Sequence, residues 1–131
     1  MQTDLDFEMP MSDFKCIHLD ENAKASVVKF VDEKVMDPAR IEQLGTELLS
    51  LADENHKKNL LINFENVKFF SSAAINKLIV LEKRMRARGG QIRLSNLRPE
   101  VRDLFSFTNL DSLFDIRREQ SEALESFDDV P

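Results

Sequence analysis

The amino-acid sequence predicts a single α/β domain with a mixed central β-sheet of four to five strands and helices packed mainly on one side. Its 131 residues suffice for one domain and are too few for two. With 42% apolar and 32% charged residues, the chain can form both a core and a charged surface. Patterns typical of strands alternate with patterns typical of helices, and right-handed crossovers place the first two long helices on the same side of the sheet.

The chain is expected to begin with an arm and a pair of strands. Residues 1–11 are acidic and lack periodicity, so we expect an N-terminal arm. Residues Phe14–Leu19 alternate between two sets of side chains, with Cys16 and His18 in one set, and Ser26–Val31 is rich in β-branched residues. Both segments are predicted strands, and the single cysteine is expected to be a small buried side chain.

The next two elements are a helix and an interior strand. Asp37 can cap free N–H groups and Pro38 suits the first helical position, so a helix is predicted from there to about Asn55. Its apolar stripe consists of Ile41, Leu44, Leu48 and Leu51. Residues Asn59–Phe64 are almost continuously apolar, as in a strand covered on both faces.

A second long helix begins at Ser71 or Ser72, because either hydroxyl can cap it. Cations near its end suit the helix dipole, and Gly89 with Gly90 can stop the helix in a left-handed conformation. Its apolar stripe is Ile75, Leu78, Leu81 and Met85.

The last predicted elements are a short strand over residues 91–94, a helix over 99–113 that opens with a proline, and a closing strand over 114–116. Residues 119–131 carry only acidic charges, and we expect a disordered acidic C-terminal tail. The folded domain is therefore expected to span residues 12–118.

The composition argues against several classes of function. Phe is the only aromatic residue type, so platforms for stacking on bases are missing and we expect no direct contact with nucleic acid. Neither His18 nor His56 has a partner at a recognisable metal-ligand spacing, and no P-loop or GxGxxG pattern occurs, so we expect no metal or cofactor. Nothing indicates an activated Cys16 thiol, and we expect no enzymatic activity.

Hydropathy indicates where in the cell the protein is located, and the charge pattern indicates which partners it could bind. No run approaches the roughly 20 apolar residues of a membrane span, and residues 1–10 lack a basic segment followed by an apolar run. We therefore expect a cytoplasmic protein. The basic residues between Glu82 and Arg102 form either a face for an acidic partner or a solvated helix face, and the residues alone favour the second interpretation.

The two serines lie where an apolar strand leads into a helix, so free N–H groups and the positive end of the helix dipole point toward them. A phosphate there would be stabilised, and it would add about −1.5 to −2 charges at neutral pH. Capping by Ser71 or Ser72 is the simpler interpretation, since serine is a favoured cap in any helix.

The stretch from Leu60 to Ile116 resembles the STAS domain of bacterial anti-sigma factor antagonists. It contains an apolar strand, a turn with the sequence FFSSAAINKL into a helix, and Gly89-Gly90 before a strand. The upstream segment from Phe14 is consistent with the first two strands and first helix of that family.

The resemblance implies a protein-binding switch controlled by phosphorylation. The unphosphorylated antagonist binds an anti-sigma factor serine kinase and so releases a sigma factor, while a serine phosphatase acts on the phosphorylated form. By position, Ser72 falls on the phosphoacceptor, with Ser71 as a second candidate, and Ala73 falls on the small residue after it. Asp37 falls on an acidic residue of the partner surface. That surface is completed by Phe69, Asn76 and Lys77.

The sequence departs from the family pattern at three positions. Ser71 stands where the family usually has Asp, Ala74 where it has Gly, and Asn63 where it often has Asp. Loss of the Asp charge keeps a cap but changes the partner surface. The alternative is therefore a STAS scaffold subunit of a larger sensory or lipid-transport complex without kinase control.

Overall fold

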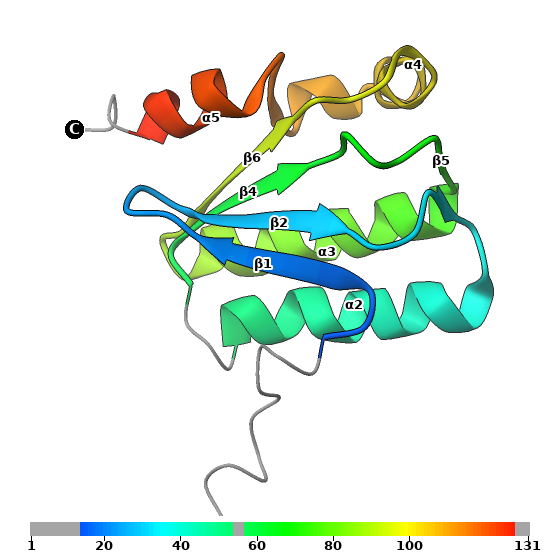
Figure 1. Cartoon of the computed structure of the whole chain (residues 1–131), viewed down its shortest axis with the longest axis horizontal. Helices are drawn as coiled ribbons and strands as arrows, with labels where there is room; N and C mark the ends of the chain where they lie inside the picture. The colour runs from blue at the N-terminus through cyan, green and yellow to red at the C-terminus, as the bar shows by residue number, and fades with distance from the viewer. Residues whose placement is uncertain (1–13, 54–56, 128–131) are drawn as a thin grey trace, which may run out of the picture.

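The structure is a computed structural model that describes residues 14–53 and 57–127. Its centre is a five-stranded sheet in which β1 is antiparallel to β2 and the other neighbours are parallel (Figure 1). In order across the sheet, the strands are β1 (Ile17–Glu21), β2 (Ser26–Phe30), β4 (Asn59–Asn63), β6 (Gln91–Ser95) and β7 (Asp115–Arg117). The prediction of an α/β domain on a mixed sheet is confirmed. The expected arm of residues 1–11 and His56 lie outside the described residues.

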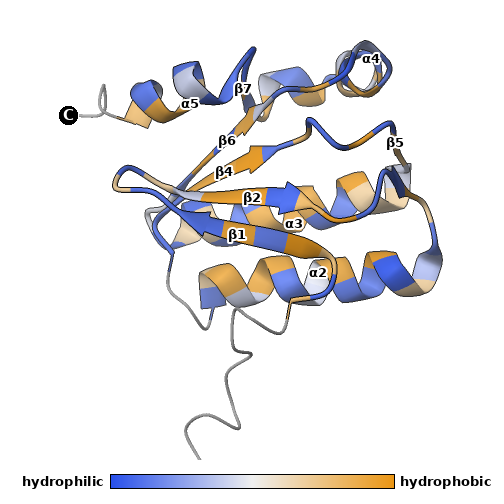
Figure 2. Cartoon of the chain, viewed as in Figure 1, coloured by the Kyte–Doolittle hydropathy of each residue, from blue (hydrophilic) through white to orange (hydrophobic). Residues whose placement is uncertain are grey.

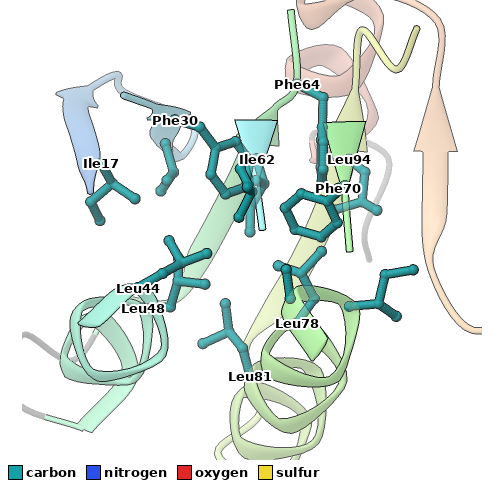
Figure 3. Packing of buried hydrophobic residues seen from close by; sticks show 14 of the residues in the cluster. Ile17, Phe30, Leu44, Leu48, Ile62, Phe64, Phe70, Leu78, Leu81 and Leu94 are labelled. Carbon is teal, nitrogen blue, oxygen red and sulfur yellow. The ribbon is translucent and has the colours of Figure 1, made fainter. Parts of the chain in front are cut away.

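Two long helices, α2 (Pro38–Asp53) and α3 (Ser72–Ala87), pack on the same face of the sheet, as predicted (Figure 1). Figure 2 shows α2 alternating between apolar and polar residues, whereas β4 is apolar along most of its length. Figure 3 shows the leucines of the two helices pointing toward the side chains of the sheet. The labelled residues of this core are Ile17, Phe30, Leu44, Leu48, Ile62, Phe64, Phe70, Leu78, Leu81 and Leu94.

A cluster of phenylalanines extends the core toward the end of the chain. The ring centroids of Phe30, Phe64 and Phe70 lie 5.0 to 5.5 Å apart. Phe64 also contacts Phe105 at 6.0 Å, and Phe105 contacts Phe114 at 5.9 Å. These tilted and edge-to-face contacts join the sheet to the C-terminal elements.

The first strand begins later than its alternation predicts. Pairing starts at Ile17, opposite Phe30, and Cys16 precedes the strand. Cys16 and Ile17 are therefore both buried while His18 is exposed, so the expectation that Cys16 and His18 share a face is wrong. The predicted burial of Cys16 is confirmed, with 4% exposure.

The helix predicted over residues 99–113 is shorter. α4 spans Pro99–Phe107, and Asn109 then adopts a left-handed conformation with φ 60° before a 3-10 turn, η2 (Leu110–Ser112). Asn tolerates this conformation better than most residues, which explains the break inside an apolar pattern.

The C-terminal residues 119–131 are predicted from the sequence to form a disordered tail. This is wrong for Gln120–Ser126, which form the helix α5. Ala123 and Phe127 pack on Val27 and Leu61, which point away from α2 and α3. The guanidinium of Arg93 lies 4.7 Å from the centroid of the Phe127 ring. The helix forms because this second face of the sheet has apolar side chains that need cover.

Two further strands form a separate small sheet: β3 (Lys34–Val35) and β5 (Phe69–Phe70) pair in parallel. No helix within the described parts of the chain is long and apolar enough to cross a membrane.

Candidate functional site

The candidate site lies where the two long helices begin. The parallel pairing places Lys34 opposite Phe69 and Val35 opposite Phe70. It continues with the backbone N–H of Ser71, which donates to the carbonyl oxygen of Val35 at 3.0 Å. The chain enters α2 shortly after β3 and α3 directly after β5, so the two helix N-termini are at the same end of the molecule (Figure 1).

Each helix start has its own cap. The Asp37 carboxylate accepts from the Arg40 N–H at 3.0 Å, as predicted. At α3, the Ser71 hydroxyl accepts from the Ala74 N–H at 3.2 Å. The structure thus decides between the two serines as caps, because Ser71 is the N-cap and Ser72 is the first residue of the helix.

The two hydroxyls differ in exposure. Ser71 is half-buried and engaged with the backbone, whereas Ser72 is exposed. Ala73 and Asn76 are also exposed, while Ala74 and Ile75 are buried. The first turn of α3 contains no acidic residue, so the positive end of its dipole is not offset by a side chain of that turn.

Lys77 connects the two helices. Its Nζ lies 3.0 Å from Oε2 of Glu42 on α2. Its methylene groups cover Gly45, where an added Cβ would come within 2.8 Å of the Lys77 Cδ. Lys77, itself a residue of the predicted partner surface, therefore holds α3 against α2.

Exposed apolar side chains flank the serines. Phe69 is 47% exposed on β5, and Met36 is 54% exposed between β3 and the Asp37 cap. Sequence reasoning selected Phe69 and missed Met36. An apolar residue immediately before a cap is the available signal, since it commonly contacts the first turn of the helix or a partner.

The loop before α2 is held by Arg40, whose Nε and Nη2 each donate to the Asp32 carboxylate at 2.9 Å. The Nη2 atom also donates to the carbonyl oxygen of Lys15 at 3.2 Å. The hydrogen bonds that Arg40 donates to the Asp32 carboxylate raise the pKa of Arg40 above its already high value. This bidentate pair fixes the loop that carries Met36 and Asp37.

Within the described residues, no group of three or more His, Cys, Asp or Glu side chains could hold a metal ion. The arrangement offers two adjacent helix starts, an exposed hydroxyl and two exposed apolar side chains. Chemically, it can bind a protein surface and accept an anionic group at Ser72.

Comparison with known proteins agrees with this geometry. The STAS domain family model matches residues 17–123. The Bordetella bronchiseptica protein BtrV, named as an anti-sigma factor antagonist, is 26% identical over 93 residues, which are 71% of this chain and 79% of BtrV.

Two solved structures share the fold. The anti-sigma factor antagonist (STAS) domain protein of Planctomyces limnophilus is 24% identical with a TM-score of 0.76, covering 85% of this chain and 97% of that one. The Bacillus protein SpoIIAA in its phosphorylated form is 20% identical with a TM-score of 0.64, covering 84% of this chain and 97% of that one. The match over residues 17–123 shows that this chain belongs to the STAS domain family, beside relatives named as anti-sigma factor antagonists.

Proposed function

We propose that this protein is an anti-sigma factor antagonist that binds an anti-sigma factor serine kinase and is released from it by phosphorylation of Ser72. The observation that supports this most directly is that the two serine hydroxyls have different environments. Ser71 caps α3, which leaves the exposed hydroxyl of Ser72 free to accept a phosphate.

The proposed binding surface surrounds that hydroxyl. It consists of Asp37, Phe69, Ser71, Ala73, Asn76 and Lys77, to which we add Met36. Phe69 and Met36 supply exposed apolar area, and the partner would bury it. The protein acts by binding and not by catalysis, and the cytoplasm is the compartment where we expect its partners.

A phosphate on Ser72 would oppose this contact for two reasons. It adds about −1.5 to −2 charges that a partner must desolvate beside apolar side chains. It also places negative charge at the end of the molecule that carries the Asp37 carboxylate. The N-terminus of α3 would stabilise the phosphate within the free protein. Phosphorylation therefore weakens binding without unfolding the domain.

SpoIIAA has been solved in a phosphorylated and an unphosphorylated form, so a protein of this fold can carry a phosphate, which supports the proposal. For this chain, the absence of Asp at position 71 removes one charge from the helix start. The proposal requires that a kinase still accepts Ser72 in that setting, and a serine phosphatase reverses the modification.

Intact-protein mass spectrometry with site mapping, on the chain purified from its native cells, tests the modification. We expect one phosphate on Ser72. Phosphate on Ser71 would relocate the switch. No phosphate in resting or stressed cells, together with elution in a large assembly on gel filtration, would instead favour the STAS scaffold subunit.

Binding is tested by calorimetry with the serine kinase encoded in the same cells. Ser72→Ala should bind like the wild type, and Ser72→Asp should bind at least tenfold more weakly. Ser121→Asp is the matched control, because it introduces the same charge at an exposed position of α5, outside the proposed binding surface, and it should bind like the wild type. Equal affinities of Ser72→Ala and Ser72→Asp would contradict the proposal.

A further inference from the structure

The apolar surface of helix α4 extends beyond the residues that the core buries. Val101 and Phe105 are buried against the sheet, and Phe105 belongs to the phenylalanine cluster. Leu104, three residues after Val101, borders this buried side, and Phe107, three residues after Leu104, extends the apolar surface outward. Leu104 is partly buried, but Phe107 is 92% exposed. Packing among residues 14–53 and 57–127 gives no structural reason for an apolar side chain at Phe107.

This side of α4 borders a groove that reaches β5. A hollow of about 190 Å³ is lined by Phe69, Phe70, Val101 and Leu104, with Lys68 and Glu100 at its edge. It continues into a wider, open hollow of about 620 Å³ lined by Leu104 and Phe107 together with Glu100, Asp103 and Ser106. Because both hollows share Glu100 and Leu104, they form one surface, the β5–α4 groove.

The charge on the groove is acidic. Glu100 and Asp103 lie one turn before Leu104 and Phe107, so each carboxylate flanks an apolar side chain. Lys68 is the basic residue at the edge, and its Nζ lies 3.4 Å from Oε1 of Glu33, which offsets its charge. The groove therefore combines an apolar floor with an acidic rim.

We propose that the β5–α4 groove docks a partner protein through a short segment whose apolar side chains are flanked by Lys or Arg. Charge complementarity selects this occupant. Residues 1–13 of the same chain contain four acidic and no basic side chains, so the rim repels them. A second copy that docked groove to groove would bring the carboxylates of both copies together. The inference goes beyond the proposed switch, because it requires neither Ser72 nor its phosphate.

The test uses two synthetic peptides of about 14 residues on the full-length chain. One has Leu and Lys at the spacing of an amphipathic helix, and the other has Glu in place of every Lys. Fluorescence anisotropy measures affinity, and amide chemical shifts in NMR spectra locate the site. The variants are Phe107→Ser, which removes the apolar anchor, and Glu100→Gln with Asp103→Asn, which removes charge and keeps shape. Val31→Ser is the control, because Val31 is 42% exposed and does not line the groove.

We expect the Lys peptide to shift amides at 68–70 and 100–107, and to bind at least tenfold more weakly to each groove variant. Affinity for Val31→Ser should stay within twofold of the wild type. The proposal is overturned if the Glu peptide binds within threefold of the Lys peptide, if the shifts lie elsewhere, or if Val31→Ser loses as much affinity as Phe107→Ser.

Two other results would also overturn it by identifying a different occupant. Self-association of the wild type that disappears in Phe107→Ser would assign the groove to a second copy. Groove shifts on deletion of residues 1–13 would assign it to the chain's own N-terminus. Failure of Ser72→Asp to weaken kinase binding would contradict the switch and leave the peptide result unchanged, so the two failures are distinguishable.

Discussion

Ser71 and Ser72 have the same side chain but differ in their contacts with the backbone. The Ser71 hydroxyl satisfies the N–H of Ala74 at 3.2 Å, while the neighbouring hydroxyl is exposed. Modification of Ser71 would change the group that caps α3, whereas modification of Ser72 would leave this hydrogen bond in place. Under the proposed function, one serine therefore stabilises the helix start and the adjacent serine carries the regulatory phosphate.

Replacing the cap should cost stability and replacing its neighbour should not. Ser71→Ala should lower the free energy of unfolding by about 1 kcal/mol, since an Ala cap leaves the Ala74 N–H without its acceptor. Ser72→Ala should leave it near the wild-type value. Urea denaturation of both variants measures this, and equal losses would show that the cap is assigned wrongly.

Cys16 provides a prediction in alkaline solution. Burial, with the negative charge of Glu47 as the next cause, raises the pKa of its thiol to about 11. In the unfolded chain the thiol titrates near 8.5. Its contribution to stability is therefore complete below about pH 8.5 and is lost as the pH rises toward the folded value.

Urea denaturation between pH 7 and 10 should show the wild type losing stability above about pH 8.5. Cys16→Ala should show a flatter profile. Because the chain contains no Tyr, no phenol titrates in this window. Identical profiles for the two proteins would contradict the burial of an un-ionised thiol.

At the scale of elements, the junction of α2 and α3 depends on a close approach. Gly45 has no side chain, and the Lys77 methylene groups occupy the space where one would be. The same lysine pairs with Glu42 at 3.0 Å. The absence of a Cβ at Gly45 of α2 thus allows Lys77 of α3 to pack against α2 and pair with Glu42.

Gly45→Ala should therefore have an effect that depends on Lys77. In the wild type, the gain in helix propensity of about 1 kcal/mol is offset by displacement of the lysine from a 2.8 Å contact. In a Lys77→Ala background the gain should appear nearly in full. A double-mutant cycle measured by urea denaturation checks this, and additive effects would refute the proposed contact.

Helix α5 gives the second prediction at this scale. Ala123→Asp should destabilise the domain by about 2 kcal/mol or more, because the carboxylate would lie against Val27 and Leu61 without a partner. Ser121→Asp is the matched control, since it introduces the same side chain at an exposed position of the same helix. Equal thermal unfolding temperatures for the two variants would contradict packing of α5 on the sheet.

At the scale of the whole molecule, the features predicted correctly are those that produce a periodic pattern of apolar residues in the sequence. The long helices have clear apolar stripes and caps, and the interior strand Asn59–Asn63 has three consecutive apolar residues at its centre. These features predicted the α/β fold and the face that the helices cover. The family resemblance, and not periodicity, selected Ser72.

Three features of the structure could not be predicted from the sequence, and each has a physical reason. The strands β3 and β5 have two residues each, too few to show alternation. The apolar residues of α5 and its C-cap are Ala123, Leu124 and Phe127, and the acidic residues among them obscure the apolar spacing. Glu47 is fully buried, and its carboxylate accepts hydrogen bonds from the backbone N–H groups of Lys15 and Cys16 at 2.9 Å, which offset the cost of burial. These contacts join residues distant in sequence, so no local pattern predicts them.

The small β3–β5 pair has a consequence for how partner choice could change over evolution. It joins two stretches of chain distant in sequence, one with Met36 and Asp37 and the other with the two serines. Under the proposed function, the first stretch identifies the partner and the second reports the cell's state. Since they are encoded separately, a duplicate of this protein could acquire a new partner through changes at 36 and 37 while its control by phosphate stayed intact.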